Sequence, residues 1–239
     1  VLDHGAGEHS GAAQVLGARR HLVLTRDQAP WWQGLVMHEK RIVPGGATYR
    51  AALFHTMLGG RPDDFHPPHL RIPPDDWRPS GLPPAYGVIH PTSAWRSKTW
   101  SSEHWVKSLA GIGGDLTWIV SSGPSDWEVE LAGAVATGLG NRALNLAGHT
   151  SLRQYLALLA GARVVLCVDG SASHLGAAFG RPVLTLFGPT NPEHWHWPSQ
   201  TTPRLWAADF TSGRTPPLDA IPVAAVRDAV GRLLEHVHA

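Results

Sequence analysis

Short apolar runs alternate with longer segments of helical character from residue 86 to the end of the chain. The runs are rich in valine, isoleucine and leucine, and the segments between them carry apolar residues at helical spacing. This alternation is typical of parallel βαβ units. It predicts strands over residues 86–90, 117–122, 143–146, 163–169 and 182–187, and helices over 101–112, 125–139, 151–159, 173–179 and 223–236.

These elements predict an α/β fold with an open, doubly wound sheet. Ligands of such sheets bind outside the carboxyl ends of the strands. Candidate chemistry is therefore expected at the residues that end the predicted strands, which are His90, Ser121 with Ser122, Leu146, Asp169, and Phe187 with Gly188.

The first 60 residues are less regular. They contain strand-like fragments at 21–25 and 40–44 and one predicted helix, 48–58, which closes at two glycines. The segment 61–84 is crowded with proline, which has no amide hydrogen for a helix or a central strand, and it is interpreted as a linker. We expect one domain with its linker over residues 1–78 and a second domain over 79–239.

Composition narrows the function classes. With 43% hydrophobic and 16% charged residues, and no apolar run near the ~20 residues of a membrane helix, the chain has the composition of a globular domain. A formal net charge of +1 gives no reason to expect nucleic acid as a partner. The single cysteine, Cys167, lies in an apolar strand and is expected in the core of a protein from a reducing compartment.

The loop after the first strand of the second domain, HPTSAWRSKTW, offers hydroxyl and cationic donors. Thr92, Ser93 and Lys98 would lie at the carboxyl end of the sheet, where such donors can hold a pyrophosphate. The chain has only three lysines, so a lysine in this loop is notable. The alternative is a solvated loop before a helix that is capped by Ser101 or Ser102.

Two acidic residues begin the next helix. Glu128 follows Ser125 by three positions, which is the spacing of a capping box and a complete structural explanation. The alternative is that Glu128 or Asp126 accepts hydrogen bonds from a ribose, because this helix starts just after the carboxyl end of the second strand.

The segment from Asp169 to His174 joins a strand to a helix. The backbone amides of Gly170 and Ser171 could meet a phosphate at the helix N-terminus, and Asp169 is expected to hold the loop amides. His174, in the first turn, is expected to be a neutral imidazole because of the positive end of the helix dipole. The alternative is an ordinary βαβ connection.

The loop after the last predicted strand, FGPTNPEHWHW, combines Gly188, which allows close backbone approach, with the hydroxyl of Thr190. Trp195 and Trp197 either pack or form flat walls for a sugar or base. The histidines of the chain show no metal-ligand spacing with suitable partners, so we expect no metal site and no cofactor.

Two segments resemble a known family. CVDGSASHLGAAFGRPVLTLFGPTNP resembles the hallmark segment of family 9 glycosyltransferases, the ADP-heptose:lipopolysaccharide heptosyltransferases, and HPTSAWRSKTWSSEHW resembles their other donor-side motif. The resemblance covers about residues 86–200 strongly and the first 60 weakly. It implies the GT-B architecture, with a complete Rossmann-like carboxyl-terminal domain and a partial amino-terminal one, and an inverting displacement.

The resemblance also implies roles for single residues. It assigns Thr92 and Lys98 to the donor phosphates, with Lys98 as stabiliser of the leaving diphosphate, and Asp126 or Glu128 to the ribose. It assigns Asp169, Ser171 and His174 to the phosphate and sugar. The family's catalytic base is an Asp after a Gly near the amino terminus; no such pair occurs in the first residues here, so the base is expected upstream of Val1. The order Gly170–Ser171 is the reverse of the family's usual order, which bears on donor choice.

The resulting prediction is an inverting transferase that moves heptose or a related sugar from an ADP-sugar to a lipopolysaccharide core acceptor. Such an enzyme would be cytoplasmic, with peripheral contact with the inner membrane as an option. Two alternatives stay open, a non-catalytic nucleotide-sugar binding module and a GT-B nucleotide-sugar epimerase, for which no convincing acid and base pair is evident.

Overall fold

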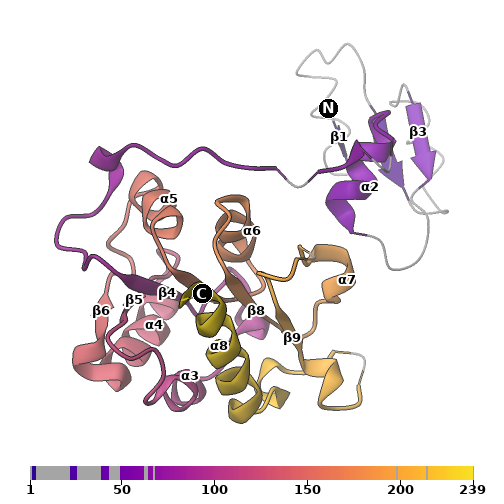
Figure 1. The fold of residues 1–239 in the computed structure, drawn as a ribbon. Coiled ribbons are helices and arrows are strands. Elements are labelled where there is room, and N and C mark those ends of the chain that lie inside the picture. Colours follow the sequence, from indigo (N-terminus) through magenta and orange to yellow (C-terminus); the bar gives the residue numbers. More distant parts are fainter. Residues whose placement is uncertain are drawn as a thin grey trace. The chain divides into compact units, whose positions relative to one another are not determined.

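The computed structural model describes residues 2–3, 22–25, 39–42, 49–61, 64–66, 68–197, 199–213 and 215–238. The chain forms two compact units, Val1–His66 and Pro67–Ala239. In the first unit, β1 (Leu2–Asp3), β2 (Leu22–Thr25) and β3 (Glu39–Ile42) pair in parallel in the order β1-β2-β3, and α2 spans Arg50–Met57 (Figure 1). The two predicted strand fragments and the predicted helix are therefore confirmed, with ends shifted by one or two residues.

The second unit is built on a six-stranded sheet that is parallel throughout (Figure 1). Its spatial order is β6-β5-β4-β7-β8-β9. All five predicted strands are present. The strands are β4 (Tyr86–His90), β5 (Thr117–Val120), β6 (Ala143–Asn145), β7 (Val164–Val168), β8 (Val183–Phe187) and β9 (Arg204–Trp206).

The sixth strand, β9, was not predicted. Its three residues follow a proline and are too few to show a strand period. It forms because it pairs with β8, with Leu186 opposite Leu205. Tertiary pairing, and not local pattern, makes this segment a strand.

Helices cover both faces of the sheet (Figure 1). One face carries α3 (Ser102–Leu109), α4 (Asp126–Leu139) and α8 (Val223–His238), and the other carries α5 (Leu152–Ala160) and α6 (Ser171–Ala178). The remaining helices are α7 (Pro192–Trp195) and the short 3₁₀ turns η3 (Asp75–Trp77), η4 (Arg96–Lys98), η5 (Gly140–Arg142), η6 (Ala207–Asp209) and η7 (Leu218–Ala220).

The order in which successive strands are added to the sheet reverses between β4 and β7. These two strands lie side by side, with His90 opposite Cys167, whereas the strands that follow each of them in sequence lie on opposite sides. This is the strand order of dinucleotide-binding folds, in which a crevice opens at the carboxyl ends of the two central strands. The fold thus places the ends of β4 and β7 where a ligand is expected.

Three fully buried tryptophans, Trp100, Trp105 and Trp118, belong to the core on the α3–α4–α8 face. Trp118 can lie flat over β4 because Gly87 has no side chain; a Cβ there would come within 2.5 Å of the indole ring. Burial of such large apolar side chains stabilises the unit.

The proline-rich segment after His66 packs on the second unit. The amide of Leu70 donates to the carbonyl of Ala178 at the end of α6 (2.8 Å), and the guanidinium of Arg153 on α5 stacks over Trp77 at 5.1 Å. The expected boundary at residue 78 therefore lies inside the second compact unit.

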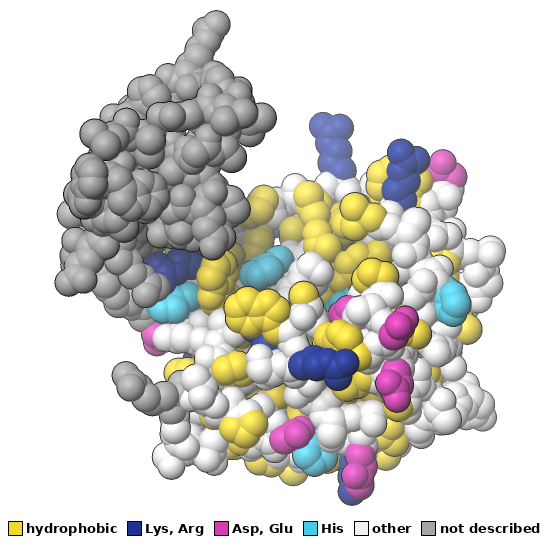
Figure 2. All heavy atoms as spheres, turned by 180° about the vertical axis from the view of Figure 1, so that it is seen from behind, with side chains coloured by type: hydrophobic (Ala, Val, Ile, Leu, Met, Phe, Trp, Pro, Cys, Tyr) yellow, Lys and Arg dark blue, Asp and Glu magenta, His cyan; other side chains and the backbone are white. Residues whose placement is uncertain are grey.

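The charge distribution matches the near-neutral composition. On the face shown in Figure 2, side chains of both signs are interspersed over the second unit. No helix in the described ranges is long and apolar enough to cross a membrane.

Candidate functional site

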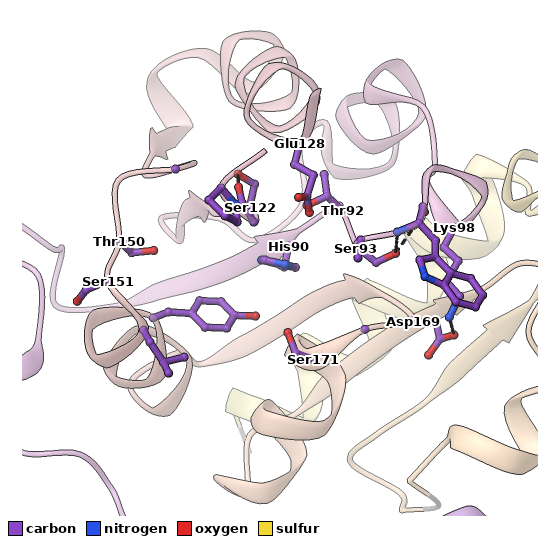
Figure 3. Close-up of a pocket in the computed structure, with 18 residues that line it drawn as sticks. His90, Thr92, Ser93, Lys98, Ser122, Glu128, Thr150, Ser151, Asp169 and Ser171 are labelled. Atoms are coloured by element: carbon purple, nitrogen blue, oxygen red, sulfur yellow. Dashed lines mark hydrogen bonds and ion pairs between the residues drawn. The ribbon is translucent and has the colours of Figure 1, made fainter. Parts of the chain in front are cut away.

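A pocket of about 650 Å³ opens at the carboxyl ends of β4, β5 and β7, at the point where the strand order reverses (Figure 3). Both polar and apolar side chains line this pocket. Its lining consists of His90, Thr92, Ser93, Ala94, Trp95, Lys98, Ser122, Gly123, Pro124, Glu128, Gly148, Thr150, Ser151, Leu152, Tyr155, Asp169, Gly170 and Ser171.

The structure brings most of the residues singled out in the sequence into this pocket. Those that line it are Thr92, Ser93, Lys98, Glu128, Asp169, Gly170 and Ser171. Those that lie outside its lining are Asp126, which is exposed at the start of α4, and His174, Gly188 and Thr190.

Lys98 and Asp169 form the charged centre of the pocket. Lys98 ends the turn η4, and its Nζ lies 2.6 Å from Oδ2 of Asp169, directly after β7 (Figure 3). Only 16% of the lysine side chain and 6% of the aspartate side chain are exposed. The ammonium also lies 4.8 Å from the centroid of the Trp95 ring. Asp169 thus holds the lysine, where the sequence suggested that it holds loop amides.

The helix after Asp169 starts earlier than predicted. The first residue of α6 is Ser171, two positions before the predicted start, and Gly170 is its N-cap. Glycine has no side chain to accept a hydrogen bond from the first turn, so the helix has no side-chain cap. The first amides of a helix lack intrahelical acceptors, and this end of α6 is therefore suited to an anion.

Glu128 lines the pocket from α4. It is 6% exposed, and its Oε2 accepts a hydrogen bond of 2.5 Å from the Ser125 hydroxyl. The predicted capping box is wrong, because Ser125 donates to the carboxylate and makes no side-chain cap to the backbone. The carboxylate lies over Gly123, where a Cβ would come within 2.6 Å of both of its oxygens.

The end of β4 contributes two buried polar groups. His90 is 7% exposed, and its Nδ1 lies 2.9 Å from the Ser121 hydroxyl. Burial lowers the pKa of His90 to about 4, against the opposing effect of the Glu128 carboxylate. Thr92 is fully buried, and its hydroxyl has no hydrogen-bond partner among the described residues. A buried hydroxyl that faces a pocket is commonly satisfied by a ligand or water.

One wall of the pocket was missed in the sequence. It is formed by Gly148, Thr150 and Ser151 in the segment between β6 and α5, and by Leu152 and Tyr155 on α5 itself. The sequence signal for this wall is AGHTS, a segment of small and polar residues that follows the predicted strand end at Leu146. Only Leu146 itself was named as a candidate position. Ser151 also caps α5 in a capping box with Gln154, so its local role conceals its place in the pocket.

His174 lies in a second, very small void with His196, Thr185 and Thr202. The pKa of His174 is lowered, which is the direction that favours the expected neutral imidazole. The largest cause is burial; Lys98 lowers the pKa further and Asp169 raises it. Burial was not foreseen, since the sequence argument relied on the helix dipole.

In the loop after β8, Gly188 is packed against the end of the sheet. Gly188 lies against Leu218: a Cβ at residue 188 would be 3.1 Å from Cδ1 of Leu218. The carbonyl of Gly188 accepts a hydrogen bond from Nε1 of Trp206. Trp195 and Trp197 do not line the pocket of about 650 Å³. Cys167 is buried, as expected, and burial raises its pKa to about 12. No cluster of metal-ligating side chains occurs within the described ranges.

Comparison with known proteins decides the family. The family model described as glycosyltransferase family 9 (heptosyltransferase) matches residues 74–211, which is more than half of the chain. The chain belongs to glycosyltransferase family 9. The matched segment contains the whole pocket, including both motifs that carried the resemblance.

Curated relatives of this family 9 chain are heptosyltransferases. Lipopolysaccharide heptosyltransferase 3 of Escherichia coli is 27% identical over 184 residues, which cover 69% of this chain and 54% of that protein. Lipopolysaccharide heptosyltransferase 1 of Pseudomonas aeruginosa is 40% identical over 109 residues, which cover 44% and 28%. The chain thus spans about half or less of the length of these two relatives.

A solved structure supports the fold. The Escherichia coli heptosyltransferase WaaC with ADP-2-deoxy-2-fluoro heptose matches with a TM-score of 0.65 at 23% identity, covering 97% of this chain and 71% of that one. At this level of identity the match shows that the family 9 chain shares the fold of that protein.

Proposed function

We propose that this chain carries the donor site of a heptosyltransferase with GT-B architecture, in which residues 79–239 bind the nucleotide sugar, the first compact unit, Val1–His66, belongs to the acceptor side, and the segment between them is a linker that packs on the second unit. The reaction would transfer heptose from an ADP-sugar to a lipopolysaccharide core acceptor with inversion. The observation that carries the proposal is the pocket at the ends of β4 and β7, where Lys98, Thr92 and the uncapped start of α6 converge.

The diphosphate is assigned to the side of the pocket formed by Thr92, Ser93, Lys98 and α6. Lysine, hydroxyls and backbone amides are all donors, and a diphosphate offers acceptor oxygens to each of them. Lys98 would also stabilise the charge that develops on the leaving diphosphate. Its pairing with Asp169 holds the ammonium in place before the ligand arrives.

The ribose is assigned to Glu128, which lines the pocket, in preference to the exposed Asp126. A buried carboxylate that has one bond to Ser125 retains acceptor capacity for a sugar hydroxyl. His174, Gly188 and Thr190 are assigned indirect roles, since they lie outside the pocket lining.

The acceptor hydroxyl must lose a proton during transfer. Both carboxylates in the pocket are engaged, Asp169 with Lys98 and Glu128 with Ser125. We assign the base to a part of the enzyme other than residues 67–239, because Asp169 is paired with Lys98 and the remaining acceptor capacity of Glu128 is assigned to the ribose. On this assignment, Glu128→Gln raises the KM for the donor more than it lowers kcat in an enzyme that carries the base.

The exchanged order of Gly170 and Ser171 leaves a hydroxyl in the pocket. Ser171 is the first residue of α6 and lines the pocket (Figure 3). We propose that this hydroxyl contributes to donor choice, because the family's usual order would place it one residue earlier in the loop.

Calorimetry with ADP tests the proposal. The chain should bind ADP, and Lys98→Ala should weaken binding by roughly 10- to 100-fold, since a charge-assisted hydrogen bond contributes about 1.5–3 kcal/mol. The matched control is Lys107→Ala, because Lys107 is exposed on α3 and pairs there with Glu103. Equal loss in both variants, or no ADP binding by the parent chain, would refute the assignment of the pocket.

A further inference from the structure

The imidazole of His90 is fixed at the floor of the pocket. Its Nδ1 lies 2.9 Å from Oγ of Ser121, which follows β5, and its ring packs against the Tyr155 ring of α5 with 5.3 Å between centroids. The side chain projects between the segments that carry Ser122 and Ser171 (Figure 3). Contacts from the segment after β5 and from α5 therefore restrict its orientation.

The burial of Ser121 decides where the imidazole proton is. Ser121 is fully buried, and His90 Nδ1 is the single partner of its hydroxyl among the described residues. If Nδ1 carried the ring proton, it would donate to Oγ, and the serine proton would be buried without an acceptor. Buried donors without partners are strongly disfavoured. The serine hydroxyl therefore donates to Nδ1, and the ring proton is on Nε2.

The titratable groups around the ring keep it neutral. Burial lowers the pKa of His90 to about 4, although the Glu128 carboxylate on α4 opposes this effect. Tyr155 on α5 and Cys167, opposite His90 on β7, are the other titratable groups against the ring. Burial raises the pKa of both, so neither is charged at neutral pH. The ring thus has one N–H donor, at Nε2.

No acceptor in the described part of the chain takes this donor. The structure shows no hydrogen bond of His90 other than that with Ser121. The two carboxylates of the pocket are engaged by Ser125 and Lys98. The buried hydroxyl of Thr92, two residues along the same segment, likewise lacks a partner. Two polar groups at the end of β4 are therefore unsatisfied in a pocket that is open to a ligand.

We propose that His90 is a ligand-binding residue that donates its Nε2 hydrogen to a diphosphate oxygen of the bound nucleotide, and that Ser121 is the positioning residue that holds the required tautomer. The inference rests on the proposed function of the pocket. It adds a residue to those already assigned to the diphosphate and to the ribose. A neutral donor binds a phosphate oxygen without a second cation beside Lys98. A neutral imidazole also forms no ion pair with the Glu128 carboxylate, which retains acceptor capacity for a ribose hydroxyl beside its bond to Ser125.

The tautomer is tested on the unmodified chain. Long-range ¹H–¹⁵N correlation spectra of histidine-labelled protein at neutral pH should show His90 as the Nε2–H tautomer, with its signals assigned by their loss in His90→Gln. Ser121→Ala should shift the ring toward a mixture of tautomers. An Nδ1–H tautomer or a protonated ring at His90 in the parent chain would overturn the inference, and this outcome does not depend on the folding of Ser121→Ala.

The ligand contact is tested by ADP calorimetry. His90→Leu should weaken ADP binding by roughly tenfold or more, since a hydrogen bond to a charged group is lost. His90→Gln, which can present an amide N–H at similar reach, should recover most of the affinity. His104→Leu, on α3 and outside the pocket lining, is the control and should bind as the parent does. If His90→Leu binds ADP as tightly as the parent, the inference about His90 is overturned but the proposed function is not. If the parent chain does not bind ADP, the proposed function is overturned, while the tautomer measurement stays valid.

Discussion

Gly123 controls the position of the Glu128 carboxylate. A Cβ at residue 123 would come within 2.5 Å of Oε2 and 2.6 Å of Oε1, so an added methyl group must displace the carboxylate. The displaced group is the flexible end of a side chain, and the backbone can stay where it is. The geometry of this one glycine is thus linked to the proposed ribose contact.

Gly123→Ala is expected to lower ADP affinity several-fold, because it moves Glu128, while the free energy of unfolding changes by less than about 1 kcal/mol. Calorimetry and urea unfolding measure the two effects. The control is Gly133→Ala in α4, where the nearest atom, Asn145 Nδ2, would be 3.6 Å from the Cβ. Equal ADP affinity in Gly123→Ala and the parent would contradict the role of Glu128.

Single residues of the site were predicted where their chemistry is local. Lys98 and Asp169 stand out because a rare lysine and a strand-ending aspartate each follow a strand of a parallel sheet. Their ion pair joins residues 71 positions apart and depends on β4 pairing with β7, which no local pattern reveals. Tyr155 was missed for the same reason: within α5 it has the spacing of a core residue, and only the tertiary fold brings it to His90.

At the scale of elements, β4 and β5 are packed through Gly87 and Trp118. A Cβ at residue 87 would lie 2.5 Å from the Trp118 indole ring of β5 and 3.0 Å from Cγ1 of Val164 on β7. Atoms on both sides are therefore close, and neither strand can move away without loss of sheet pairing.

Gly87→Ala is expected to destabilise the second unit by about 1–3 kcal/mol, the usual effect of overpacking a core. Urea unfolding followed by tryptophan fluorescence measures this change. Gly231→Ala in α8 is the matched control, since a Cβ there meets nothing within 4 Å and alanine favours a helix interior by up to about 1 kcal/mol. A Gly87→Ala variant as stable as the parent would show that Trp118 repacks freely.

The elements themselves were predicted well where they are long and regular. Strands β4, β7 and β8 are continuous buried apolar runs, and such runs are readable from sequence. The start of α6 was placed two residues late, because glycine at the N-cap has none of the side-chain signals that mark a helix start. The strand β9 depends on its partner, and the sequence of three residues has no period to read.

At the scale of the whole molecule, the buried His90 and the partly buried His196 are expected to make stability depend on pH. Burial is the largest cause that lowers the pKa of His90 and of His196 to about 4 in the folded state, from an ordinary value of 6.5. Between these pH values the unfolded chain binds more protons than the folded chain, so the folded state loses stability as the pH falls.

The free energy of unfolding is therefore expected to be nearly constant above about pH 7 and to fall as the pH drops from about 6.5 to about 4. Urea unfolding at a series of pH values measures the slope. His196→Gln should flatten the curve, because one of the neutral groups is removed. A stability that rises on acidification through this range would contradict the burial of these histidines in neutral form.

The central claim is that the pocket at the ends of β4 and β7 binds a nucleoside diphosphate. Hydrogen exchange measured by mass spectrometry, with and without saturating ADP, locates the ligand directly. The account predicts slower exchange in residues 90–99 and 169–174, and no change in 112–116 and 231–235, which border a second pocket lined by residues that precede β4, β5 and β7. Protection confined to 112–116 and 231–235, or binding without protection of 90–99 and 169–174, would contradict it.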